Sequence, residues 1–225
     1  VWLGGNNELR SKTKVTSDNI SLDTLSNWNY DGSSTSQASG NDSEVIIVPR
    51  CLFYDPFNKN GYLVMCDTFK PDMTTPISNN HRVYAESIFS KKLEDKPWYG
   101  LEQEYFLIDP KTQKPLGFPM EGEPNPQGQY YCSAGAENAF GRQIAQEHLE
   151  KCIEAGIEVS GMNAEVAPGQ WEFQVGPVEG VNAGDHLWMA RYLLLRVAEK
   201  HGGMVAFEPK PVKGEWNGAG GHSSF

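Results

Sequence analysis

Two short strand-like segments place glutamates among large apolar residues, and this pattern restricts the folds open to the chain. In residues 101–108 (LEQEYFLI), strand alternation puts Glu102 and Glu104 on one face with Phe106 and Ile108. The Cα atoms of the two glutamates are then about 7 Å apart. Because their charges repel and burial makes unpaired charge costly, a divalent cation is the simplest counter-ion.

The second segment supports the same conclusion. Polar and apolar residues alternate over 170–175 (QWEFQV), which is the period of a half-buried strand. A Pro-Gly pair at 168–169 predicts a turn before this strand, so Glu165 and Glu172 flank the turn. Late in the chain, His222 follows a glycine tract and supplies an imidazole. Each carboxylate taken alone could be a solvated strand residue, but four of them beside Trp, Phe and Tyr favour a shared site.

The types of ligand indicate which metal to expect. Oxygen ligands with one imidazole suit Mg²⁺ or Mn²⁺, whereas a structural zinc site more usually recruits thiolates. The four cysteines show no Cys-x-x-Cys spacing. They are scattered, and no secretion signal is visible, so we expect reduced thiols in a cytosol-like compartment.

Charge and hydropathy disfavour several classes of partner. A formal net charge of -10 argues against a nucleic-acid or anionic-membrane surface, because phosphate binding needs clustered Lys and Arg. There is no run of 18 apolar residues and no charged-then-apolar leader. We therefore expect neither a membrane span nor a signal peptide.

The order of predicted elements indicates an α+β protein with two domains. Helices are expected over Asn80–Asp95, over 140–153 with a cap at Gly156, and over 185–197. The small polar stretch Ser33–Ser43 is compatible with a flexible loop. Before residue 75 the predicted strands are Val1–Leu3, Arg10–Val15, Val45–Pro49, Leu52–Asp55 and Tyr62–Phe69.

Five strings resemble glutamine synthetases of the eukaryotic type (type II), in order along the chain: NWNYDGSST, GLEQEYFL, NAEVAPGQWEFQVGP, DHLWMARYLL and WNGAGGH. The resemblance implies a small N-terminal β-grasp domain over 1–75 and a catalytic domain over 80–225. It also implies an ATP-dependent ligase of nitrogen assimilation that makes L-glutamine from L-glutamate and ammonia through γ-glutamyl phosphate. No P-loop motif is present, so bound metals would carry more of the phosphate binding.

The resemblance also assigns roles to single residues. Glu104, Glu165 and Glu172 would hold one ion, while Glu102 and His222 would hold a second nearer the ATP phosphates, giving two or more Mg²⁺ or Mn²⁺ per site. The residues implied for ammonium and its deprotonation are Asp31, with Ser34 and Tyr131 beside it, and those implied for glutamate are Asn217 and Gly218. The residues implied for the nucleotide are Trp98, Glu102, Glu172, Phe173, Gln174, Val175, Gly176, Pro177 and Ser224.

Simpler interpretations of some of these residues stay open. Asp31 could be a turn residue, Tyr131 a packed aromatic and Trp98 a plug at a helix end. Asn217 and Gly218 could form a tight turn. Ser224 departs from the family, since relatives usually have His-Thr-Asn at 222–224.

The resemblance further implies a ring-shaped homo-oligomer of two stacked pentamers. The loop from Asp31 to Ser34 would then reach the active site of a neighbouring subunit. A cytoplasmic location is expected, and an organellar one stays open. We expect further C-terminal residues to supply one metal carboxylate, a flap acid and the arginines that bind phosphate and glutamate, so this chain alone would be an incomplete catalyst.

Rival functions come from different classes. The same fold serves γ-glutamyl-amine ligases and guanidino-substrate kinases, but the Asp31-Gly-Ser-Ser34 and QWEFQVGP strings favour ammonia as the acceptor. A catalytically silent structural relative should have lost metal carboxylates, whereas all those within this span are present. A two-domain acidic binding protein is the remaining alternative, which metal-dependent binding of an ATP analogue would separate from an enzyme.

Overall fold

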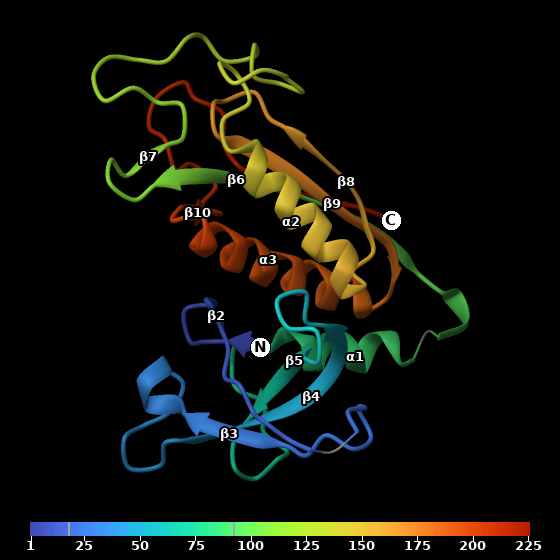
Figure 1. Cartoon of the computed structure of the whole chain (residues 1–225). Helices are drawn as coiled ribbons and strands as arrows, with labels where there is room; N and C mark the ends of the chain where they lie inside the picture. The colour runs from blue at the N-terminus through green and yellow to red at the C-terminus, as the bar shows by residue number, and fades with distance from the viewer. Residues whose placement is uncertain (18, 92) are drawn as a thin grey trace. The chain divides into compact units, whose positions relative to one another are not determined.

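The chain folds into two compact units (Figure 1). The computed structural model describes residues 1–17, 19–91 and 93–225. The first unit comprises Val1–Lys96 with Gly180–Asp185, and the second comprises Pro97–Glu179 with His186–Phe225. The predicted domain ranges, 1–75 and 80–225, stay a prediction.

The first unit is built on a three-stranded antiparallel sheet in the order β3-β4-β5. Apolar side chains that alternate along β4 and β5, such as Val45, Ile47 and Met65, are buried and form its core. A second, two-stranded sheet pairs β1 with β2. The strands are β1 (Trp2–Leu3), β2 (Leu9–Arg10), β3 (Trp28–Asp31), β4 (Glu44–Tyr54) and β5 (Tyr62–Phe69).

Two of the strand predictions for this unit need correction, and one strand was not anticipated. The strand expected over Arg10–Val15 ends at Arg10, because the exposed segment after it places Lys12 over the indole ring of Trp28 instead of pairing with a strand. The two strands expected before and after residue 50 are one, since a bulge between Pro49 and Cys51 keeps β4 paired with β5. Strand β3 was not predicted.

The helix expected over Asn80–Asp95 is shorter than predicted. Helix α1 spans His81–Phe89, and a separate 3₁₀ turn, η2, spans Leu93–Asp95. Lys92 falls within the predicted range but outside the described residues. Arg82 on α1 forms a bidentate ion pair with buried Asp185, at 2.8 and 2.9 Å.

The described part of the second unit holds a six-stranded antiparallel sheet in which β6 is central. The main order is β10-β6-β9-β8, and β7 and β11 also pair with β6. The strands are β6 (Trp98–Asp109), β7 (Lys114–Pro115), β8 (Val159–Ala164), β9 (Gln170–Glu179), β10 (Met204–Ala206) and β11 (Gly221–Ser224). The predicted strands over 101–108 and 170–175 are thus confirmed.

Helices α2 (Arg142–Ala155) and α3 (Asn182–Lys200) cover one face of this sheet (Figure 1). His148 of α2 packs edge-on against Phe173 of β9, with ring centroids 4.8 Å apart, and bonds to the Ala190 carbonyl of α3 at 2.9 Å. The predicted cap at Gly156 is confirmed by its left-handed backbone (φ 81°). Since strand residues alternate, the neighbours of Phe173 must face away from the helices.

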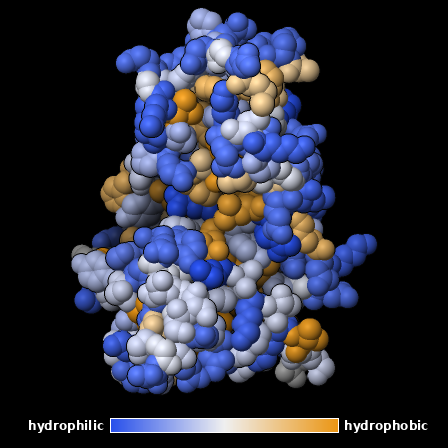
Figure 2. Space-filling model, turned by 90° about the vertical axis from the view of Figure 1, so that its left-hand side faces the viewer, coloured by the Kyte–Doolittle hydropathy of each residue, from blue (hydrophilic) through white to orange (hydrophobic). Residues whose placement is uncertain are grey.

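Polar residues cover most of the face drawn in Figure 2, with apolar residues visible between them. Among the described residues, no helix has the length and apolar character that crossing a bilayer requires.

Candidate functional site

The predicted metal carboxylates gather on the sheet face opposite α2 and α3. Glu104 on β6 lies across from Glu172 on β9, and Glu165 follows directly after β8. Ligand oxygens of these three residues, called group A, lie within 4.8 Å of one another. All three residues are 8–9% exposed. The structure therefore brings together the three glutamates that the resemblance assigns to one ion.

A second group overlaps the first. His222 on β11 pairs with Glu102 on β6, and its Nδ1 lies 3.0 Å from a Glu102 carboxylate oxygen. Ligand atoms of Glu102, Glu172 and His222, called group B, also lie within 4.8 Å of one another. Unlike group A, this group opens to solvent, with Glu102 and His222 side chains 46% and 63% exposed. Glu172 belongs to both groups.

Burial and neighbouring negative charges change the pKa values of two of these carboxylates, Glu165 and Glu172. Burial, and then the nearby carboxylates Glu104 and Glu172, raise the pKa of Glu165. Burial also raises the pKa of Glu172, with Glu102 and Glu104 adding to the effect and a hydrogen bond from Gln174 opposing it. A cation would relieve this repulsion. Carboxylate oxygens with one imidazole fit a hard divalent ion such as Mg²⁺ or Mn²⁺, and within the described residues neither group includes a cysteine.

Two amide side chains join the carboxylates of group A. Asn163 donates to a Glu165 oxygen at 3.0 Å, and Gln174 donates to the Asn163 side-chain oxygen at 2.8 Å. Gln174 also donates to Glu172 through a short hydrogen bond. Asn163 was not predicted as a site residue, although its place two residues before Glu165 in a strand-and-turn pattern puts it on the same face.

The glycine-rich segment is anchored directly on Glu104. The Gly220 amide donates to a Glu104 carboxylate oxygen at 2.5 Å, and the Glu104 amide donates back to the Gly220 carbonyl at 3.0 Å. At Gly218 a Cβ would lie 2.5 Å from the Pro209 carbonyl oxygen, so only glycine fits. These contacts bring Asn217 and Gly218 beside group A.

The residues expected to bind nucleotide line different surfaces. Trp98 begins β6 and is 62% exposed, while Ser224 pairs with Gly100 at the same end of the strand. Phe173 and Val175 are both 1% exposed and lie on the helix-covered side of β9. Only their backbone is therefore available to a nucleotide, and Gly176 and Pro177 follow in the same strand.

Tyr131 is exposed and lies within the electrostatic reach of group A. Cys132 beside it, followed by Glu165 and Glu172, raises the pKa of the Tyr131 phenol. The phenol thus stays protonated and can serve as a hydrogen-bond donor near the carboxylates.

Asp31 lies in the first unit, at the end of β3, where it caps the short helix η1 (Gly32–Thr35). Its carboxylate accepts hydrogen bonds from the Ser33 hydroxyl at 2.6 Å, the Ser34 hydroxyl at 2.9 Å and the Ser33 amide at 3.0 Å. These donors, led by the Ser33 hydroxyl, lower the pKa of Asp31, so it stays anionic. Ser33 was not singled out from the sequence.

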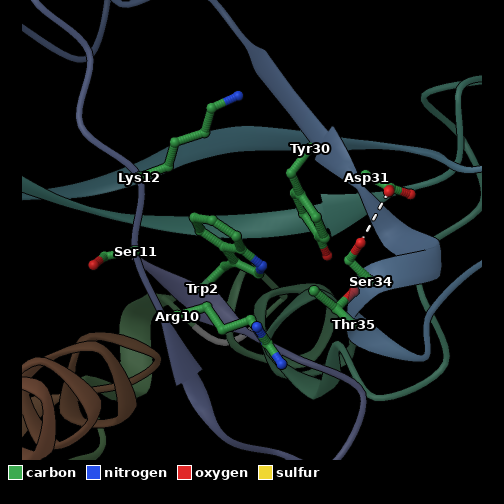
Figure 3. Close-up of a pocket in the computed structure, with 8 residues that line it drawn as sticks. All are labelled: Trp2, Arg10, Ser11, Lys12, Tyr30, Asp31, Ser34 and Thr35. Carbon is green, nitrogen blue, oxygen red and sulfur yellow. Dashed lines mark hydrogen bonds between the residues drawn. The ribbon is translucent and has the colours of Figure 1, made fainter.

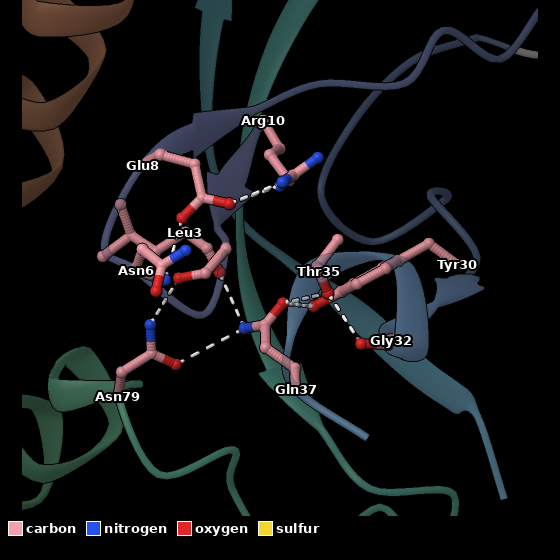
Figure 4. A network of polar contacts seen from close by, with 10 residues as sticks. Leu3, Asn6, Glu8, Arg10, Tyr30, Gly32, Thr35, Gln37 and Asn79 are labelled. Atoms are coloured by element: carbon pink, nitrogen blue, oxygen red, sulfur yellow. Dashed lines mark hydrogen bonds and ion pairs between the residues drawn. The ribbon is translucent and has the colours of Figure 1, made fainter. Parts of the chain in front are cut away.

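An open pocket of about 480 Å³ adjoins Asp31 (Figure 3). Its lining residues are Trp2, Arg10, Ser11, Lys12, Tyr30, Asp31, Ser34 and Thr35. Beside it, Gln37 fixes the loop that carries Asp31 (Figure 4). The Gln37 side-chain oxygen accepts from Tyr30 and Thr35, both at 2.7 Å, and its amide donates to the Leu3 carbonyl at 2.9 Å. The 33–43 stretch, for which a flexible loop was one open interpretation, is therefore tied to β1 through Gln37.

Comparison with known proteins decides the family. The family described as "Glutamine synthetase, catalytic domain" matches residues 82–225. The chain belongs to the glutamine synthetase family. A "Glutamine synthetase nodule isozyme" of Vigna aconitifolia and a "Glutamine synthetase cytosolic isozyme 2" of Vitis vinifera are each 52% identical to it over 230 residues. A "Putative glutamine synthetase" of Acanthamoeba polyphaga mimivirus is 50% identical over 231 residues.

These matches cover 100% of this chain and 64% of each relative, so the chain spans a little under two thirds of a typical curated glutamine synthetase. Among solved structures, "Apo GmaS without ligand" matches 87% of this chain and 46% of its own, with a TM-score of 0.68 and 21% identity. This likeness shows the fold alone. It supports the mixed helix-and-sheet catalytic fold of the glutamine synthetase family, and the β-grasp assignment of the first unit stays a prediction.

Proposed function

We propose that a full-length protein containing this chain is an ATP-dependent ligase that forms L-glutamine from L-glutamate and ammonia. The observation that carries the proposal is the pair of overlapping groups A and B on one sheet face, joined through Glu172 and linked to the Asn217-Gly218 segment through Glu104. The identity of 50–52% to proteins named glutamine synthetase over the whole chain supports it.

Groups A and B would hold two divalent ions, Mg²⁺ or Mn²⁺. When bound, these ions would neutralise charge on the phosphates of ATP during phosphoryl transfer. The γ-phosphoryl group passes to the γ-carboxylate of glutamate, giving γ-glutamyl phosphate and ADP, and attack by ammonia releases phosphate. Asn163 and Gln174 would hold the carboxylates of Glu165 and Glu172 in place for this step.

Asn217 and Gly218 would bind the amino-acid substrate. Trp98, Ser224 and the backbone of 172–177 would contribute to the nucleotide pocket, with Tyr131 donating near the reacting carboxylate. Asp31 would bind NH₄⁺ and accept its proton, because the attacking species must be NH₃. Its lowered pKa suits the first role better than the second, so cation binding is its main contribution.

We also propose a ring homo-oligomer of two stacked pentamers, in which Asp31 of one subunit completes the site of the next. The proposed location is the cytoplasm, supported by relatives named cytosolic isozymes. The rival γ-glutamyl-amine ligase is less well supported, since the relatives at 50–52% identity are named glutamine synthetases. A silent structural relative is disfavoured by the assembled carboxylates.

The full-length protein, with Mg²⁺ or Mn²⁺, should produce glutamine and ADP in equal amounts from glutamate, ammonium and ATP. Methylamine and ethylamine in place of ammonium should give far slower ADP release. No glutamine under any of these conditions would overturn the proposal, and faster turnover with an alkylamine would favour the rival ligase.

The inter-subunit site has its own test. Asp31→Asn should be impaired at low ammonium and Glu104→Gln in metal binding, and mixed, reassembled rings of the two should make more glutamine at low ammonium than either variant alone. Reassembly must be demonstrated with a mass-tagged subunit. Demonstrably mixed rings without this gain would show that each site is built within one chain.

A further inference from the structure

Gln170, the first residue of β9, connects the turn bearing Glu165 to the segment bearing Asn217. Its side chain is 1% exposed, and each of its polar atoms is used. The amide nitrogen donates to the Gly218 carbonyl at 3.0 Å. The side-chain oxygen accepts from the Asn217 side chain at 3.1 Å and from the Ala167 amide at 3.3 Å.

The backbone of the same residue extends this connection. The Gln170 carbonyl accepts a hydrogen bond from the Glu165 amide at 2.9 Å. One buried residue thus closes the 165–170 turn of group A and holds the neighbouring loop. Because these hydrogen bonds are buried or partly buried, removing the side chain would leave partners unpaired, which costs more than the net value of a hydrogen bond.

A second glutamine holds the same segment from outside. Gln127 accepts from the Asn217 backbone amide at 2.9 Å and donates to the Glu215 carbonyl at 2.9 Å. Gln127 is exposed, in contrast to Gln170. The two side chains therefore fix both the backbone and the side chain of Asn217.

These contacts determine how Asn217 is presented. Its side-chain nitrogen is engaged by Gln170, so its side-chain oxygen is the group left to receive a donor such as a substrate ammonium. A loop residue without such contacts would sample several rotamers, and ordering it would weaken substrate binding.

We propose that Gln170 is a positioning residue that orients Asn217 and Gly218 for the amino-acid substrate, with Gln127 holding the backbone of the same segment. In this role both residues act through the 215–218 segment, because the polar side-chain atoms of Gln170 and Gln127 bond to it. The inference rests on the proposed function only in naming glutamate as the ligand. An apolar side chain of similar volume would fill the same space but could make none of these contacts.

Gln170→Met in the full-length protein tests this directly. We expect the KM for glutamate to rise about tenfold, with the KM for ATP changed by less than about threefold. Leu193→Ala is the matched control, because Leu193 is fully buried in α3 and its loss should lower the melting temperature without moving the KM for glutamate. Equal shifts for both substrates in Gln170→Met would overturn the inference.

A double-mutant cycle separates positioning from general destabilisation. If Gln170 acts through Asn217, Gln170→Met should add less than about twofold to the KM for glutamate in an Asn217→Ala background. Fully additive effects would contradict the inference. If Gln170→Met does not fold, the same double-mutant cycle can be measured with Gln127→Met, because Gln127 is exposed. The same two outcomes for the KM for glutamate then support or contradict the inference.

Hydrogen exchange gives a readout that does not need catalysis. Amides in 215–220 should exchange at least about fivefold faster in Gln170→Met and Gln127→Met than in the parent protein or Leu193→Ala. If the variants exchange faster but the parent protein makes no glutamine, the proposed function is rejected and the positioning role is kept. If exchange in the variants is unchanged and the parent protein makes glutamine, the positioning role is rejected and the proposed function is kept.

Discussion

Glu104 on β6 lies directly across the antiparallel ladder from Glu172 on β9, and both carboxylates belong to group A. Like charges at directly opposed positions destabilise a sheet, so this pairing works against folding when no cation is bound. Burial is the main cause of the raised pKa of Glu172, and the nearby Glu102 and Glu104 carboxylates add to it. A site of this kind gains most from an ion that both residues share.

Glu172 should be the residue on which both ion sites depend. Glu172→Gln is expected to weaken binding of two Mn²⁺ ions, whereas Glu102→Gln and Glu104→Gln should each weaken one, because Glu172 alone is common to groups A and B. Mn²⁺ titration of the full-length protein followed by electron paramagnetic resonance gives the number of tight sites. One tight ion left in Glu172→Gln would contradict the shared role.

Asp31→Asn should raise the KM for ammonium by about tenfold or more and leave the KM for glutamate within about twofold, because Asn lacks the charge that binds NH₄⁺. Ser33→Ala is the informative companion, since the Ser33 hydroxyl is the main cause of the lowered pKa of Asp31. Ser33→Ala should raise the pKa of Asp31, and the pH below which ammonium binding weakens should therefore move to a higher value. An unchanged ammonium dependence in Asp31→Asn refutes the assignment.

His148 should make the fold sensitive to acid. Burial lowers the pKa of His148 to about 4, against 6.5 when unfolded, so the unfolded chain binds more protons between these values. Stability therefore falls as the pH drops through 6.5, by about 2 kcal/mol from pH 7 to pH 5. Urea unfolding at both pH values should show a smaller loss in His148→Gln. An equal loss in the variant would exclude His148 as the cause.

The four cysteines should differ sharply in reactivity. Cys132 is exposed, whereas burial raises the pKa of the Cys51 thiol to about 11 and raises those of Cys66 and Cys152. With Ellman's reagent on the native 225-residue chain, we expect one fast thiol and three released by unfolding. Cys132→Ser should abolish the fast phase. A fast phase that persists in this variant would mean that another thiol is accessible.

The sequence predicted local features of the fold better than pairings. Alternation of polar and apolar residues located β6 and β9, and a glycine marked the end of α2. Each of these signals is contained within a few neighbouring residues. Strand β3 was missed since it has only four residues with no fully buried side chain. The bulge in β4 depends on its partner β5, which no local pattern records.

The candidate site shows the same division. Alternation places Glu102 and Glu104 on one face, but only the register of three strands brings Glu172 and His222 to them. The supporting amides of Asn163 and Gln170 were missed for a related reason. Their partners are set by tertiary packing, so the residues look like ordinary polar positions in a strand.

One edge of β6 is covered along most of its length, by β11 against Gly100–Gln103 and by β10 against Phe106–Ile108. An uncovered strand of this kind is a template for pairing between molecules, and its alternating apolar residues would favour aggregation. Strand β11, which carries His222, therefore also protects the protein from aggregation. Deleting this strand should first cause precipitation during refolding, before any loss of activity could be measured.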